Sequence, residues 1–439
     1  MKSTITFLSL FVATMVIAPR PSYGQYAWVP VYTDEAAAEA YNSAPGQTGY
    51  ATYVDEDLED FEGKGGDCDS AGKGGGKSDC NCLRCRNAGW MSRAFGGIEY
   101  LHWYQKGSRL PPLVTEGTAG AGFQNPGTRL LFGGNFVGDD LMVGLRVTAG
   151  LWLDECKTRA VVVRGFGSEG ASTPFSINAP TAGFPFYGIP YYNTFPPASE
   201  DGFRVAQPGV GGTVTVQAST DVYGGDAMYK TLLDNGSDYR LDLLAGYQYS
   251  RIDDDLVVST DSAFPFSTND LFDVSNEFNA ATLGLSGDFN QGPVTFQLMG
   301  KLGIGNMRQS VGIAGNHVTP GGVPGAGGFF AQPPNGGARF NIGEYERDIF
   351  TLSPEASAKM IWCVKDNFSI SIGYTFLYWN HVAMAGDQID RRTLDSTGSV
   401  NQSVVFGGPY AGGGANPAFV FRDTDFYVHT IDIGALFKY

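Results

Sequence analysis

The chain has 439 residues and a formal net charge of −16, and it contains 61 Gly and 23 Pro. Hydrophobic residues make up 43% of the sequence, which excludes an acidic disordered polymer, and the frequent Gly and Pro argue against long helices. The negative charge argues against nucleic acid as a partner, because phosphates bind to basic surfaces.

The first segment, residues 1–24, has the pattern of a secretory signal peptide. Lys2 supplies the positive end, Ile5 to Ala18 forms an apolar core, and small residues precede Gln25. The apolar run is shorter than the ~20 residues that a membrane-spanning helix needs. We therefore expect an exported protein, with a retained membrane anchor as the alternative.

Residues 25–93 are expected to form a flexible, Gly-rich periplasmic arm. The run from Asp55 to Glu62 contains six acids, and Gly and Lys residues follow as far as Lys77. Such a composition buries too little apolar surface to offset the loss of chain entropy on folding. We therefore expect no packed domain before residue 94.

The arm also contains a cysteine cluster, which comprises Cys68, Cys80, Cys82 and Cys85. Its last two members have the spacing of metal ligands, but no second pair or His follows at the distance typical of a zinc site. In an exported protein, disulfide bonds are the first expectation and a metal site is the alternative. Residues 71–78 lack the first Gly of a phosphate-binding loop and follow no strand, so they predict no nucleotide site.

From residue 94 onward, apolar and polar residues alternate, which predicts β-strands. Residues 368–378 place Phe, Ile and Tyr on one face and mostly Ser, Gly and Thr on the other. Such runs exceed the ~5–6 residues of an ordinary strand and suit the ~9–11 residues of a membrane-crossing strand. Aromatic residues flank aliphatic ones on the apolar faces, as in the girdles of outer-membrane barrels. The ten expected strands are 94–105, 141–153, 158–167, 221–233, 238–252, 275–289, 293–308, 346–364, 367–381 and 425–439.

These strands predict an all-β fold, a transmembrane antiparallel up-and-down β-barrel over residues 94–439. The links between strands alternate between short turns and long segments, as do the periplasmic turns and extracellular loops of bacterial outer-membrane barrels. The alternation within Thr213–Gln217 could add a hairpin, so twelve strands are the alternative. The long links are expected near 106–140, 168–220, 254–273, 310–345 and 383–423.

The last strand places apolar and aromatic residues on one face and ends on an aromatic residue. This pattern resembles the C-terminal signal by which the barrel-assembly machinery recognises outer-membrane barrels. We therefore expect this machinery and outer-membrane lipid as partners. The residues of the signal are Tyr427, Ile431, Ile433, Phe437 and Tyr439.

Several short motifs occur in a characteristic order, namely Gly97–Trp103, Leu110–Thr115, Leu131–Gly134, Gly144–Arg146, Leu151–Leu153 and Leu243–Tyr249. In this order they resemble the putative beta-barrel porin family 7, which is found mainly in planctomycetes, over residues 88–439. The resemblance implies an outer-membrane barrel and brings no catalytic or binding residues to carry over.

Ionisable residues on the polar strand faces are expected to line the lumen. They could tune ion selectivity, or they could pair with one another and fill a narrow lumen. Barrels of ~8 strands enclose little more than side chains, whereas ~16–18 strands leave an aqueous channel, so ten strands predict a narrow passage. The lumen-lining candidates are Arg146, Lys230, Arg240, Asp242, Lys301, Glu355, Lys359 and Asp432. Asp226 is also expected on an inward face.

These features predict a narrow porin-like channel for ions or small solutes in the cell outer membrane, with no cofactor and no metal. The alternative is a structural or surface-interaction barrel with a filled lumen, in which the aromatic loop 184–197 either folds over the barrel mouth or forms a contact patch. A barrel enzyme is the remote alternative, for which His381 near Asp387 or Asp390 is the best candidate pair.

Overall fold

The computed structural model describes residues 93–117, 127–179, 185–194, 198–207, 209–262, 267–319, 321–334, 339–393 and 416–438. The expected signal peptide, nearly all of the expected arm with its cysteine cluster, and Tyr439 lie outside these residues. No helix in these ranges is long and apolar enough to span a membrane.

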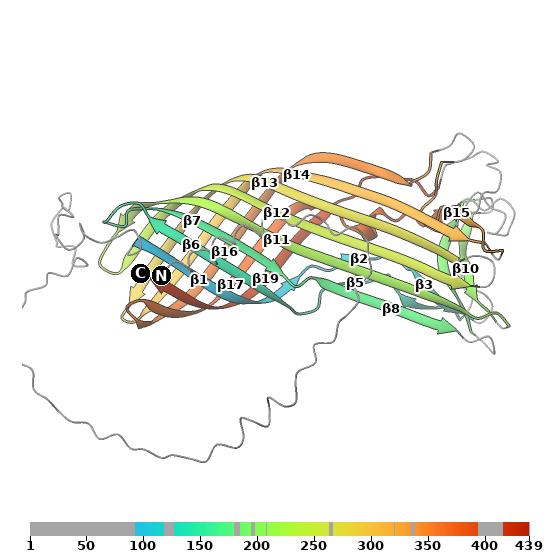
Figure 1. Cartoon of the computed structure of the whole chain (residues 1–439), viewed down its shortest axis with the longest axis horizontal. Coiled ribbons are helices and arrows are strands. Elements are labelled where there is room, and N and C mark those ends of the chain that lie inside the picture. Colours follow the sequence, from blue (N-terminus) through green and yellow to red (C-terminus); the bar gives the residue numbers. More distant parts are fainter. Residues whose placement is uncertain are drawn as a thin grey trace, which may run out of the picture. The chain divides into compact units, whose positions relative to one another are not determined.

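Ten antiparallel strands of the described chain close into a ring, and the last of them pairs with the first (Figure 1). Each strand pairs with its neighbours along this series, which is the up-and-down topology that the sequence predicts. The all-β barrel is therefore confirmed. In ring order, the strands are β1 (Ala94–Gln105), β6 (Met142–Trp152), β7 (Arg159–Ser168), β11 (Gly212–Asn235), β12 (Tyr239–Ser262), β13 (Ser267–Gln291), β14 (Val294–Val318), β16 (Gly343–Lys365), β17 (Phe368–Val382) and β19 (Thr424–Lys438).

Alternation along the strands separates an outer apolar wall from inner positions that are polar toward the short turns. On β17, Ile370 and Ile372 are exposed on the outside, whereas Ser369 and Ser371 are buried inside. Successive side chains of a strand point to opposite faces, so this arrangement follows directly from the sequence. A continuous exposed apolar wall is the surface that lipid covers in an outer-membrane barrel.

The strands β11, β12, β13, β14 and β16 are longer than the sequence predicts. The predicted outer loop 254–273 is wrong, because β12 and β13 continue through it and leave only a short connection. The outer faces of these extensions carry Asp253, Asp255 and Glu277, so they meet water rather than lipid. Their polar composition is typical of a loop, although the inner positions remain alternately apolar.

The link 168–220 does contain a hairpin, β9 (Phe186–Asn193) with β10 (Ser199–Ala206), but it belongs to a second sheet and adds no strand to the ring, so the twelve-strand alternative is wrong. Residues 213–217 belong to β11, which begins at Gly212. β8 (Ala171–Ala179) pairs with residues 212–220 of β11, and β7 pairs with residues 223–231. Gly170, at φ +83°, lies between β7 and β8. β8 and β15 (Pro324–Ala326) extend the sheet beyond the ring and do not widen it.

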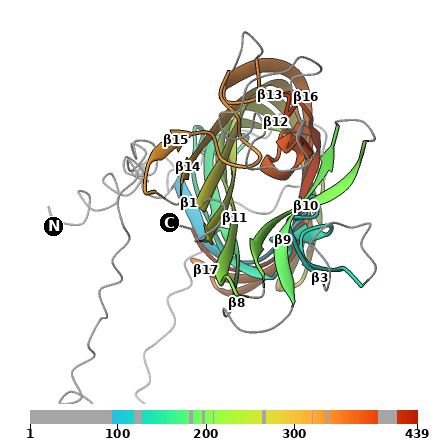
Figure 2. The ribbon, with the colours of Figure 1, turned by 90° about the vertical axis from the view of Figure 1, so that its right-hand side faces the viewer.

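A second sheet packs against the inner faces of the extended strands at the long-loop end of the barrel (Figure 2). The core between the two layers includes Val114, Ile189 and Phe203 from the second sheet and Val258 and Phe272 from the barrel wall. The smaller elements of this region are β10 (Ser199–Ala206), β9 (Phe186–Asn193), β3 (Val114–Gly117), β4 (Arg129–Phe132), β18 (Arg392–Thr393), the pair β2 (Ser108–Arg109) and β5 (Phe136–Val137), and the 3-10 turn η2 (Ala385–Gln388).

Candidate functional site

One group of buried charges joins four strands inside the barrel. Arg164 on β7 binds Asp226 on β11 at 2.5 Å and Glu355 on β16 at 2.6 Å. Lys301 on β14 binds the same two carboxylates, with its Nζ 2.9 Å from Glu355 Oε2. Two cations therefore share two acids, so each charge taken out of water has two opposite partners.

A second group lies on the strands where the ring closes. Arg146 on β6 binds Asp432 on β19 at 2.8 Å and Glu99 on β1 at 3.2 Å. Lys359 on β16 binds Glu99, and Thr375 Oγ1 on β17 donates to Asp432 at 2.6 Å. We call the two groups together the charge layer, which consists of Glu99, Arg146, Arg164, Asp226, Lys301, Glu355, Lys359 and Asp432.

A third group lies closer to the short turns. Asp242 is fully buried, and its carboxylate binds Lys230 at 2.9 Å and Arg240 at 2.7 Å. The guanidinium of Arg240 also lies 4.9 Å from the ring centre of Trp152, which is within cation–π range. This group places two cations and one acid at the short-turn end.

All eight predicted lumen-lining residues lie at interior positions, and each has an opposite charge within 4 Å. The structure brings five of them into the charge layer and the other three into the third group. The prediction missed Glu99 and Arg164. Both share a strand face with residues that turn inward, Leu101 on β1 and Phe166 on β7, so the same alternation rule could have found them.

Next to the charge layer, on the long-loop side, apolar side chains fill the lumen. The indoles of Trp103 and Trp379 are both 0% exposed. Trp379 Nε1 donates to Ser250 Oγ at 3.0 Å, so its buried N–H is satisfied. We call this the apolar layer, which consists of Leu101, Trp103, Met142, Phe166, Ala171, Val222, Ile252, Phe278, Ala280, Met307, Leu377, Trp379, Val382, Met384, Phe426 and Val428.

Two buried carboxylates lie beyond the apolar layer, in the strand extensions outside the lipid-facing band. Asp270 on β13 accepts hydrogen bonds from the backbone N–H groups of Phe329, Phe330 and Ala331, at 2.7–2.9 Å. Burial raises the pKa of Asp270 to about 7, against the lowering effect of these donors. Burial likewise raises the pKa of Asp254 on β12 to about 6.

The contact of Asp270 with residues 329–331 should weaken as the pH rises. Asp270 keeps its proton up to about pH 7 while it is bound to residues 329–331, whereas a released, hydrated Asp loses its proton near the ordinary pKa of 3.8. Between these two values, rising pH therefore favours the released state. We expect faster amide hydrogen exchange in residues 327–332 at about pH 8 than at about pH 5, after correction for intrinsic rates. Asp270→Asn should remove this difference, and an equal difference in that variant would contradict the assignment.

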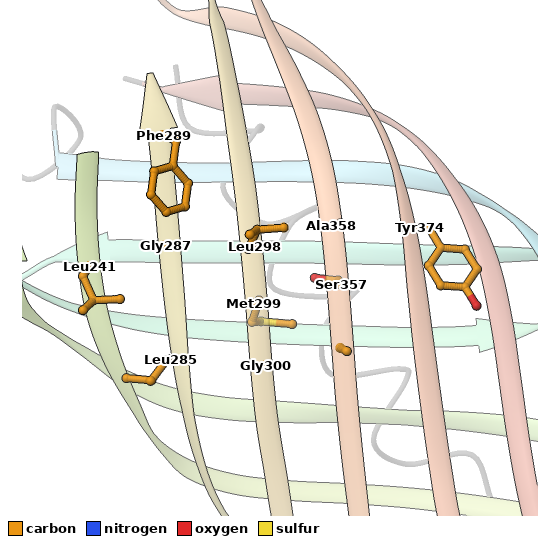
Figure 3. A pocket seen from close by; sticks show the side chains of 11 residues that line it. Leu241, Leu285, Gly287, Phe289, Leu298, Met299, Gly300, Ser357, Ala358 and Tyr374 are labelled. Carbon is orange, nitrogen blue, oxygen red and sulfur yellow. The ribbon is translucent and has the colours of Figure 1, made fainter. Parts of the chain in front are cut away.

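The outer wall carries the predicted assembly residues and a shallow apolar groove. Tyr427, Ile431, Ile433 and Phe437 lie on the outer face of β19. The groove, about 520 Å³, lies between Leu241 and Tyr374 on the same outer face (Figure 3). It belongs to the lipid-facing wall and does not open into the lumen.

The described part of the aromatic loop, residues 185–194, packs inward. Ile189 and Tyr191 are buried, and the ring of Tyr191 lies edge-on to Phe329 at 5.4 Å. This placement agrees with a loop that buries its own rings over the barrel mouth, and the remaining residues of 184–197 lie outside the described chain.

The best enzymatic pair is not formed. His381 Nδ1 lies 2.9 Å from Asp423 Oδ2, and Asp390 binds Arg392. No group of three or more metal-binding side chains occurs among the described residues. Near the short turns, Cys156 is disulfide-bonded, whereas Cys363 is free and exposed.

Comparison with known proteins gives one family. The family described as Putative beta barrel porin-7 matches residues 95–439. No curated protein matches the chain.

Solved outer-membrane proteins share limited similarity with the chain. The outer membrane protease OmpT from Escherichia coli is 13% identical, over 81% of this chain and 100% of that chain, with a TM-score of 0.39. A FadL homologue from Pseudomonas aeruginosa is 7% identical, over 79% and 90%, with a TM-score of 0.22. An anion-selective porin from Comamonas acidovorans is 9% identical, over 78% and 98%, with a TM-score of 0.17.

Proposed function

Because the chain belongs to the Putative beta barrel porin-7 family, we propose that this porin-like outer-membrane barrel is a narrow channel for ions or small solutes. The charge layer carries the proposal. It lies at the depth of the lipid-facing band, since Asp432 is buried between Ile431 and Ile433, whose side chains are each 50% exposed on the outer wall. A barrel that served only as an anchor could fill this depth with apolar side chains at less desolvation cost.

The chemistry of the charge layer suits selective passage of small charged solutes. It contains four acids and four cations, each held by at least one partner on another strand. Rings of charged side chains set the ion selectivity of channels. In the charge layer, a passing ion can replace one partner of a pair, so each charge keeps an opposite partner. The apolar layer beside it closes the passage in the state described.

The alternative is a structural or surface-interaction barrel whose lumen is permanently filled. Its support is the apolar layer, in which two fully buried indoles and several aromatic rings cross the lumen. Membership of a porin family supports transport over an enzymatic role. In both cases we propose export by the signal peptide and assembly through the outer face of β19.

Planar bilayers distinguish the two functions. The purified protein should give small, discrete conductance steps, and Lys359→Ala should shift the reversal potential toward cations, since it leaves four acids against three cations in the charge layer. Lys438→Ala is the matched control, because Lys438 lies exposed at the short-turn end of β19. A barrel that folds but never conducts would favour the filled-lumen alternative.

A further inference from the structure

The chain after β17 turns into the lumen and crosses it. Counting around the ring, β13, β14 and β16 separate β17 from β12, so these two strands stand almost opposite each other. Nevertheless η2, which follows β17, lies against β12 and β13 (Figure 2, the orange-red helical turn). The segment 383–389 therefore spans the interior from one side of the wall to the other.

This crossing segment belongs to both apolar regions of the interior. Met384 packs in the apolar layer, whereas Ala383, Ala385 and Ile389 pack in the core beneath the second sheet. None of the four is more than 4% exposed. Withdrawal of the segment would therefore open both regions together.

Asn276 on β13 holds the start of the segment in the manner of a neighbouring strand. Its Oδ1 accepts from the Ala383 N–H at 2.7 Å, and its Nδ2 donates to the Ala383 carbonyl at 2.9 Å. The same Nδ2 also donates to the carbonyl of Ile252 at 3.1 Å, which connects the segment to β12. One side chain thus satisfies both backbone groups of Ala383.

Asp254 on β12 holds the next turn. Its Oδ2 accepts from the Ala385 N–H at 2.7 Å and from Ser108 Oγ at 3.1 Å, and its Oδ1 accepts from Thr220 Oγ1 at 2.6 Å. A Cβ added at Gly386 would lie 2.3 Å from the carbonyl oxygen of Arg109, so the segment packs too closely against β2 to accept a side chain at this position. The position of the segment is thus set by directional contacts as well as by packing.

We propose that residues 383–389 are the gate of the barrel, and that Asn276 and Asp254 are its latch. The proposal rests on the channel function above. Apolar contacts are non-directional, whereas the latch fixes the segment at one place with hydrogen bonds to backbone groups. Releasing the latch leaves buried backbone groups unpaired, so the segment is driven toward water, and Met384 leaves the apolar layer with it.

The test measures the accessibility of the gate without relying on conduction. Met384→Cys in a Cys363→Ser background places a thiol at a position that is 1% exposed. Peptide mapping after reaction with a membrane-impermeant maleimide reports the labelling of this position separately from that of Cys68, Cys80, Cys82 and Cys85. Adding Asn276→Ala should raise the labelling rate by at least ~10-fold, since it deletes three buried hydrogen bonds. Asn276→Asp keeps the acceptor for the Ala383 N–H but places an oxygen against the carbonyls of Ile252 and Ala383, so it should also raise the labelling rate.

The matched control is Asn341→Ala. Asn341 clamps another inward segment in the same way, since its Oδ1 accepts from the Gln332 N–H at 2.9 Å and its Nδ2 donates to the Phe330 carbonyl at 2.7 Å. This variant should leave the labelling of position 384 unchanged. An equal increase in labelling in Asn341→Ala would show that the whole interior had loosened, and it would contradict the proposed gate.

The outcomes separate the gate from the channel. If labelling rises in the Asn276 variants and conductance rises with it, both proposals stand. If labelling rises without any conductance, the gate moves but the channel function fails. If labelling stays at the background rate in folded Asn276→Ala and Asp254→Ala proteins, the segment is a static plug and the proposed gate is wrong.

Discussion

Glu355→Ala should destabilise the folded barrel by roughly 3–5 kcal/mol, the cost of breaking a buried ion pair by removing one partner. Glu355 is the carboxylate that Arg164 and Lys301 share with Asp226, and the side chains of all four are no more than 8% exposed. After the substitution, two buried cations face one acid. The midpoint of unfolding in guanidinium, followed by tryptophan fluorescence in detergent micelles, measures the loss.

Glu346→Ala on the same strand is the control. Glu346 pairs with Arg308 on the outer wall at 2.8 Å, with the two side chains 58% and 53% exposed. Water solvates both charges there, so the loss should stay below ~1 kcal/mol. Equal losses in the two variants would mean that the charge layer is hydrated in solution.

Trp379→Ala should both destabilise the barrel and open its interior. Removing a fully buried large aromatic side chain costs about 3–5 kcal/mol when the surroundings cannot collapse, and a barrel wall closed by hydrogen bonds has little freedom to collapse. The cavity also removes one of the two indoles that close the apolar layer. We expect a lower unfolding midpoint and more frequent or larger conductance steps.

Trp362→Ala separates these effects from the loss of any tryptophan. Trp362 lies on the outer face of β16 and is 54% exposed. Its loss should change stability much less and leave conductance unaltered. Unchanged conductance in Trp379→Ala, with the expected loss of stability, would place the closing element elsewhere in the interior.

The strands and their facing could be predicted because two environments act on alternate residues. Along β17, lipid-facing and interior positions differ at every step, so the sequence indicates both the strand and its inner face. Beyond the lipid-facing band the outer environment is water, and Asp253 and Asp255 then give β12 the composition of a loop. The alternation weakens there, although the backbone pairing continues.

Pairing inside the lumen could not be predicted, because it depends on strand register. Arg146 on β6 meets Asp432 on β19 over the intervening β1 only through the particular stagger of these three strands. The gate could not be predicted from the sequence either, because backbone groups of residues 383–389 bind side chains more than 100 positions away in sequence. No local pattern records such a partner.

The pairing of β1 with β19 also constrains how the molecule is made. Eleven residue pairs connect the two ends of the barrel, from Phe95 opposite Lys438 to Gln105 opposite Val428. The ring therefore cannot close until synthesis has passed Thr424, and until then β1 and β17 both present unpaired backbone edges. Such edges are templates for aggregation, and contacts this distant in sequence form slowly. The two open edges must therefore be shielded from other chains until the fifteen-residue strand β19 is available.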